Sequence, residues 1–130
     1  MASIFTRIIR GEIPSYKIAE NDEFYAFLDI NPLNEGHTLV VPKREVDYIF
    51  DLENNEVGGL FMYAQEVAAA IRKAVPCERI GVAVIGLEVP HAHVHLCPIN
   101  GMSDLNFANP KKQFTKEEFQ QTAERIRQHL

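Results

Sequence analysis

The chain has 130 residues, of which 46% are hydrophobic and 24% charged, and a formal net charge of −5 at pH 7. This length is enough for one domain, residues 1–130, with a substantial core. It is short for two domains. The acidic balance, without a block of lysine and arginine, argues against broad nucleic-acid binding but leaves room for a small anionic ligand in a local site.

Cysteine usage and hydropathy predict an intracellular, cytoplasmic protein. The two cysteines, Cys77 and Cys97, lack CxxC spacing, so we expect no disulfide framework. The N-terminus does not follow the pattern of a secretory signal. No apolar run approaches the roughly 20 residues that span a bilayer, so we expect no membrane partner.

The first half of the chain predicts a short helix followed by three strands. Residues 3–11 place four apolar side chains at helical spacing before a glycine. Residues 15–21 and 23–30 are typical of two strands joined by a turn. Residues 29–36 are rich in turn-forming residues, which indicates a loop. Residues 37–42 are apolar and β-branched, which predicts a buried strand that ends at a proline.

The second half predicts the longest helix, two further strands and a C-terminal helix. Apolar residues recur at i, i+3, i+4 and i+7 over residues 54–74, shortly before a proline. Residues 79–86 and 91–98 are typical of strands. Residues 115–130 begin with a threonine–glutamate capping box and carry an apolar stripe. These elements predict an α+β fold, an antiparallel sheet of about five strands with one central and one C-terminal helix.

The segment VPHAHVHLCP, residues 89–98, places His91, His93 and His95 at two-residue spacing. In a strand such residues share one face, about 6.5–7 Å apart, while the apolar residues between them occupy the other face. The chain has five histidines, so chance produces this pattern in roughly one sequence in a hundred.

Three interpretations of this row are open. The histidines can be structural, although three titratable groups on a half-buried strand are costly without a task. They can bind a metal ion with His37 as a further ligand, although no carboxylate lies between them. They can catalyse phosphoryl chemistry, one imidazole attacking while the others orient it and bind oxygens. The middle position of His93, with a potential donor on each side, favours the third interpretation.

Two blocks of the sequence resemble the histidine triad (HIT) family. HAHVHLCP follows the family signature of three histidines alternating with apolar residues. Residues 3–43 resemble the N-terminal half of the family, including the D-I-x-P loop and the G-H-x-L-V-x-P-K strand. The similarity is close over residues 1–99 and loose over residues 100–130. It implies a HIT-like fold, a homodimer with a shared sheet, and the Hint-like phosphoramidase branch.

The resemblance also implies a reaction: cleavage of a purine nucleotide, such as an adenosine phosphoramidate, at its α-phosphate to release a product such as AMP. By this resemblance His93 attacks phosphorus and forms a nucleotidyl-histidine, which water then releases. The main-chain carbonyl of His91 holds the Nδ1 proton of His93, His95 donates to a phosphate oxygen, and His37 lies behind the row. Dinucleoside polyphosphate hydrolysis is one alternative, and nucleotide binding with negligible turnover is another. No cofactor is implied.

A nucleoside pocket follows from the same resemblance. Asp29 is expected to accept hydrogen bonds from the ribose hydroxyls. The apolar residues expected to cover the sugar or line the base are Ile30, Ile4, Phe5, Ile8, Ile13 and Phe27. Their composition alone equally indicates plain core, and only the order of the whole block favours a pocket.

The N-terminal block departs from the family pattern in a way that bears on metal binding. Many bacterial members of the family bind structural zinc through an N-terminal C-x-x-C and two histidines. Ser3 and Thr6 stand in place of the cysteines here, and Glu45 in place of a histidine. We therefore predict no metal.

The segment before the triad departs as well. In the family an asparagine at the strand end and a glutamine before the triad both approach the phosphate. Here the glycine-rich loop between them is deleted, Leu87 replaces the glutamine, and both donors are lost. Loss of one such donor costs about 3 kcal/mol in the transition state, so turnover is expected to be slow unless the tail with Lys111 and Lys112 compensates. Glu88 lies at the mouth of the triad. Two unit charges at 4 Å repel by about 4 kcal/mol at an effective dielectric constant of 20, so we expect its carboxylate to point away from the phosphate.

Overall fold

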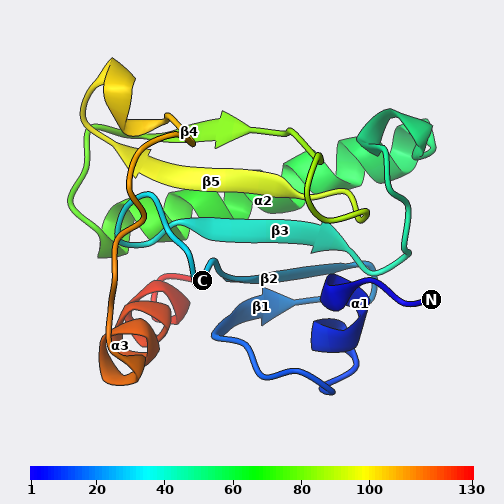
Figure 1. The fold of residues 1–130 in the computed structure, drawn as a ribbon, viewed down its shortest axis with the longest axis horizontal. Coiled ribbons are helices and arrows are strands. Elements are labelled where there is room, and N and C mark those ends of the chain that lie inside the picture. The colour runs from blue at the N-terminus through cyan, green and yellow to red at the C-terminus, as the bar shows by residue number, and fades with distance from the viewer.

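The computed structural model describes residues 1–130, and its elements follow the predicted order (Figure 1). The helices are α1 (Ile4–Ile9), α2 (Asn54–Ala74) and α3 (Lys116–Arg127), with short 3₁₀ turns at Ile49–Asp51 and Met102–Asp104. The strands are β1 (Lys17–Glu20), β2 (Phe24–Leu28), β3 (Thr38–Pro42), β4 (Arg79–Ala83) and β5 (Val94–Ile99). The predicted α+β fold is confirmed. None of the helices combines the length and apolar character of a membrane span.

The five strands form one antiparallel sheet in the order β1-β2-β3-β5-β4. The pairing of β3 with β5 decides where the site lies, because it sets Leu39 opposite His95 and Val40 opposite Val94. Residues more than fifty positions apart in the chain therefore lie side by side in the middle of the sheet.

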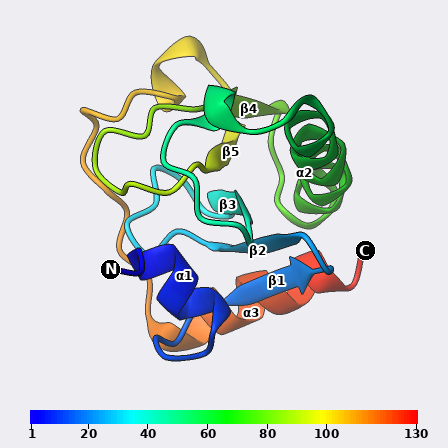
Figure 2. The same ribbon diagram turned by 90° about the vertical axis from the view of Figure 1, so that its right-hand side faces the viewer.

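Both faces of the central strands are buried. Figure 2 shows α2 on one side of the sheet and α1 on the other. All residues of β2 and β3 are buried, since alternate side chains enter two different clusters. The larger cluster packs residues of β2, β3 and β5 against α2 and α3. The smaller one, the α1-side cluster, consists of Phe5, Ile8, Tyr25, Phe27, Leu39 and Val41.

Helix α2 covers the larger cluster and matches its predicted range. Its first turn is closed by a capping box between Glu53 and Glu56. Gly59 lies against β2, because a Cβ atom added there would sit 3.1 Å from the ring of Phe24. This glycine serves close helix–sheet packing.

The prediction that all three histidines lie in one strand was wrong. β5 begins at Val94, so only His95 lies in it, and His91 and His93 belong to the irregular segment before it. β3 ends at Pro42, which has no N–H to continue the ladder. The N–H of Ala92 instead donates to the carbonyl of Val46, at 2.7 Å. Ala92, Val94 and Leu96 still enter the larger cluster as expected.

Candidate functional site

Four buried histidines converge where β3 and β5 run side by side. His37 directly precedes β3 and is 1% exposed. The exposed fractions of His91, His93 and His95 are 0%, 7% and 8%. The fifth histidine, His129, is exposed near the C-terminus. Four imidazoles removed from water are expensive unless each nitrogen has a partner, so their hydrogen bonds define the site.

The tautomer of His93 is fixed by the main chain. Its Nδ1 lies 2.7 Å from the carbonyl oxygen of His91. A carbonyl oxygen can only accept a hydrogen bond, so Nδ1 carries the proton and donates it. The neutral ring then keeps its lone pair on Nε2. The contact that the resemblance predicts between the carbonyl of His91 and Nδ1 of His93 is present, and the role of His93 as nucleophile stays a prediction.

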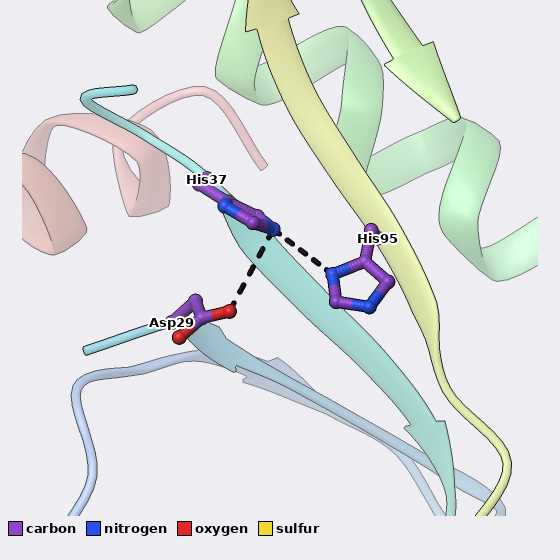
Figure 3. A group of neighbouring side chains, drawn as sticks. All are labelled: Asp29, His37 and His95. Atoms are coloured by element: carbon purple, nitrogen blue, oxygen red, sulfur yellow. Dashed lines mark hydrogen bonds and ion pairs between the residues drawn. The ribbon is translucent and has the colours of Figure 1, made fainter. Parts of the chain in front are cut away.

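A second chain of hydrogen bonds fixes His37 and His95. The backbone N–H of Leu33 donates to Nδ1 of His37 at 3.0 Å, so the proton of a neutral His37 resides on Nε2. This nitrogen lies 3.0 Å from Nδ1 of His95 and donates to it (Figure 3). The remaining proton of a neutral His95 therefore sits on Nε2. The backbone amide of Leu33 thus sets two tautomers in succession.

The surroundings keep this pair uncharged. Burial lowers the pKa of His37 to about 4, and the positive charge of Lys111 acts in the same direction. Burial also lowers the pKa of His95 to about 3, with further contributions from its histidine neighbours. Both rings are therefore neutral at pH 7, and His95 offers Nε2–H as a neutral donor.

Asp29 lies beside His37, the middle member of this hydrogen-bond chain. Its Oδ2 is 3.7 Å from Nε2 of His37, as Figure 3 shows, and its Oδ1 accepts from the N–H of Asn31 at 2.8 Å. Burial raises the pKa of this half-buried carboxyl. The positive charge of Lys111 lowers this pKa, and the negative charge of Glu88 raises it further. The carboxylate therefore has acceptor capacity left for a ligand.

Asp29, His37 and His95 are also close enough to suggest a metal site, since one ligand atom of each lies within 4.8 Å of the others. The hydrogen bonds do not fit one. Nδ1 of His37 uses its lone pair to accept from Leu33, so Nε2 carries a proton and has no lone pair for an ion. The arrangement is a hydrogen-bond relay.

This relay predicts a pH-dependent stability. The unfolded chain binds a proton on each histidine near pH 6.5, whereas the folded chain does so only near pH 4 for His37 and pH 3 for His95. The unfolded state therefore binds more protons as the pH falls below 6.5, and stability present at pH 7 is lost. We expect the free energy of unfolding to fall by about 2 kcal/mol for each histidine between pH 7 and pH 5.

Urea unfolding at both pH values measures this loss. The His95→Gln variant, which cannot titrate there, should lose correspondingly less between pH 7 and pH 5. A variant that loses as much as the original protein would show that His95 does not carry the effect.

The α1-side cluster contains most of the predicted pocket residues. Phe5, Ile8 and Phe27 are buried in it, and Ile13 packs against it. The ring of Phe5 meets His91 and His93 edge-on, with centroid distances of 5.7 and 5.0 Å.

Two predicted pocket residues are exposed. Ile4 and Ile30 are 49% and 64% exposed and do not belong to the α1-side cluster. Phe5, Ile8, Ile13 and Phe27 therefore lie in or against one cluster, in which Phe5 contacts His91 and His93, whereas Ile4 and Ile30 are exposed apolar residues.

Phe107 was not identified from the sequence as a neighbour of the histidines, and Ser3 was noted only as a replacement for a zinc ligand. The ring of Phe107 packs against His95 at 4.8 Å and His37 at 6.2 Å. The hydroxyl of Ser3 lies 2.7 Å from Nδ1 of His91. The sequence predicts compensation from the tail through Lys111 and Lys112, but no spacing rule places an aromatic residue of the tail on a histidine.

The tail also brings a positive charge near the site. Lys111 donates to the carbonyls of Phe107, at 2.6 Å, and Asn109, at 3.2 Å, and its charge acts on Asp29 and His37. The segment after the deleted loop is solvent-facing: Leu87 is 89% exposed and Glu88 is exposed as well.

Comparison with known proteins gives a consistent result. The sequence pattern of the HIT domain matches residues 10–102. Adenosine 5'-monophosphoramidase of Saccharomyces cerevisiae is 36% identical over 102 residues, which cover 75% of this chain and 62% of the yeast protein.

Solved structures agree with the sequence comparison. A HIT-like protein of Bartonella henselae superposes with a TM-score of 0.87 at 31% identity, covering 98% of this chain and 96% of that one. A zinc-bound histidine triad family protein of Mycobacterium smegmatis gives 0.85 at 26% identity, covering 99% and 93%. The match of the domain pattern over most of the chain, together with these relatives, shows that this protein belongs to the HIT family.

Proposed function

We propose that this protein is a nucleotide hydrolase or nucleotidyl transferase that cleaves a purine nucleotide at its α-phosphate, with His93 as the nucleophile. The observation that carries the proposal is the 2.7 Å hydrogen bond from Nδ1 of His93 to the carbonyl of His91, which leaves Nε2 with its lone pair. The name of the yeast relative supports adenosine phosphoramidates as the substrate class. Membership of the HIT family supports the same chemistry.

The reaction proceeds in two displacements. In the first, the Nε2 lone pair of His93 forms a bond to the α-phosphorus while the bond to the leaving group breaks. The leaving amine or phosphate takes the electron pair, and the amine takes a proton from solvent water, which the attacking water of the second step gives back. In the second, a water oxygen attacks the same phosphorus, the N–P bond breaks, and a nucleoside monophosphate is released. Imidazole suits both steps because it is a fair nucleophile and a good leaving group near neutral pH.

The other histidines stabilise charge and geometry in this scheme. The Nε2–H of His95 donates to a non-bridging oxygen, where negative charge builds up in the transition state. His37 holds His95 in that tautomer through its 3.0 Å hydrogen bond. Because both rings have strongly lowered pKa values, they act as fixed dipoles and do not exchange protons near pH 7.

The nucleoside is proposed to bind on the α1 side of the sheet. Asp29 accepts from the ribose hydroxyls through its free acceptor sites, and the base lies against Phe5, whose ring contacts His91 and His93, and Phe27, whose ring contacts Phe5. Ile4 and Ile30 are exposed apolar residues that can cover the nucleoside from outside. The homodimer implied by the resemblance stays a prediction, to be checked by light scattering of the purified protein.

The proposal is tested by offering adenosine 5'-phosphoramidate and diadenosine polyphosphates side by side and measuring AMP. We expect faster release of AMP from the phosphoramidate. Faster cleavage of the polyphosphates favours the alternative of a dinucleoside polyphosphate hydrolase. Binding of AMP in calorimetry without any product over hours defeats the enzymatic proposal and favours a binding module.

Glu88 is proposed to stay outside the reaction. Its side chain is exposed, and the Glu88→Gln variant removes a negative charge that acts on Asp29. We expect kcat to stay within about 2-fold and KM for the nucleotide to fall modestly, because repulsion of the phosphate is relieved. A pH–rate profile makes the comparison, with Glu117→Gln on α3 as the control. A large fall in rate together with loss of the alkaline limb would instead identify Glu88 as the general acid.

A further inference from the structure

Side chains from three separate segments meet at His91. Ser3 is the N-cap of α1, Thr6 lies in its first turn, and Glu45 follows β3. The N–H of Ser3 and the hydroxyl of Thr6 both donate to Oε1 of Glu45, at 2.7 and 2.6 Å. The hydroxyl oxygen of Ser3 lies 2.7 Å from Nδ1 of His91, 88 positions away in the chain. We call Ser3, Thr6, Glu45 and His91 the α1 cluster.

The directions of the two shortest hydrogen bonds at His91 can be assigned. Nε2 of His91 lies 2.7 Å from the carbonyl of Pro42, which can only accept, so Nε2 carries a proton. Burial lowers the pKa of His91, which favours the neutral ring with its lone pair on Nδ1. The hydroxyl of Ser3 therefore donates to Nδ1 and accepts from the N–H of Thr6 at 3.0 Å. Both nitrogens of His91 are occupied.

Glu45 anchors the cluster from outside. Its hydrogen bonds with the Thr6 hydroxyl and the Ser3 backbone hold the pKa of its carboxyl at about 2, so it stays ionised at neutral pH. Helix α1 has no acidic residue in its own first turn. Glu45 supplies that negative charge from another part of the chain.

The α1 cluster does not fit zinc, which the family binds at this place in many members. Zinc takes thiolate, imidazole or carboxylate ligands. Ser3 and Thr6 offer hydroxyls, and both nitrogens of His91 already have partners. In this protein hydrogen bonds connect α1 to His91, a connection that a shared zinc ion makes in the zinc-binding members.

The geometry points to Ser3 as a positioning residue for His93, acting through His91 by hydrogen bonds alone. This inference rests on the proposed role of His93 as nucleophile. The ring of His91 is held at one nitrogen by Ser3 and at the other by Pro42. The carbonyl of this same residue accepts the Nδ1 proton of His93. Ser3 and Pro42 together fix where His91 lies, and loss of the Ser3 anchor lets the whole residue shift, so that its carbonyl no longer holds Nδ1 of His93 at 2.7 Å.

The test uses Ser3→Gly, because glycine is tolerated at an N-cap but has no hydroxyl. We expect kcat to fall about 10- to 100-fold, as misplacement of a reacting group does, with KM almost unchanged. Nitrogen-15 NMR of the histidine rings should show His93 protonated on Nδ1 in the original protein and a tautomer mixture in the variant. Ser3→Thr, which keeps the hydroxyl, should restore both readouts.

Ser15→Ala is the matched control, since the hydroxyl of Ser15 bonds to Tyr25 and not to a histidine. It should leave kcat and the ring spectra unchanged. An unchanged kcat and His93 spectrum in Ser3→Gly overturns the inference, and so does a shift of the His91 signals on addition of EDTA. The NMR comparison needs no substrate, so it decides the role of Ser3 even if the protein turns over no nucleotide and the proposed function fails.

Discussion

Replacing His93 with alanine is expected to lower kcat at least about 10⁴-fold, the largest effect of any single change in this protein. The covalent route requires a lone pair on Nε2 of this ring, and no other histidine presents one in the same way. His91 has both nitrogens occupied. His95 has Nδ1 occupied by His37, which leaves its proton on Nε2.

Binding should respond differently from turnover in this variant. The nucleoside contacts proposed for Asp29, Phe5 and Phe27 do not involve the lost ring, so affinity for AMP is expected to stay within about 10-fold. Calorimetry and a single-turnover assay measure the two quantities on the same preparation. His129→Ala, which removes an exposed histidine, is the control and should match the original protein. A His93→Ala protein that turns over normally refutes the nucleophile assignment.

Replacing His95 with alanine is expected to lower kcat about 10²- to 10³-fold, as loss of one preorganised oxyanion donor does. His95 is 8% exposed, and its pKa of about 3 keeps it a neutral donor throughout the neutral range. The effect should therefore be nearly the same from pH 6 to pH 8. A charged donor with a pKa near 6.5 would instead give a loss that depends on pH in this range.

His95→Gln distinguishes a lost donor from lost packing. The amide group of glutamine can donate to a phosphate oxygen, so this variant should recover part of the rate. It cannot restore the contact of the imidazole with Phe107, at a centroid distance of 4.8 Å. If glutamine restores nothing although the protein remains folded by circular dichroism, the role of His95 is packing against the tail.

The sequence alone determined most of the fold because its patterns are local. The i, i+3, i+4, i+7 spacing of apolar residues predicted α2 within its observed range, Asn54–Ala74. Alternating and β-branched segments predicted five strands, whose ends shifted by a few residues. Whether Phe5 and Phe27 line a site or fill the core could not be read from composition. The order of the N-terminal block favoured a pocket, which stays a prediction: both rings are buried in the α1-side cluster, where Phe5 contacts His93 and Phe27 contacts Phe5.

The tertiary structure decided which distant segments of the chain are in contact. β5 begins at Val94 because its partner strand ends at Pro42, which cannot donate to the ladder. Protonation in the site depends on the backbone amide of Leu33 and the carbonyl of His91, groups that every residue type carries and no sequence motif reveals. Ser3 and Phe107 reach the histidines from opposite ends of the chain. Local spacing of residues encodes helices and strands. The tautomer of each histidine and the long-range hydrogen bonds are set only when the chain folds, because they depend on groups from distant segments.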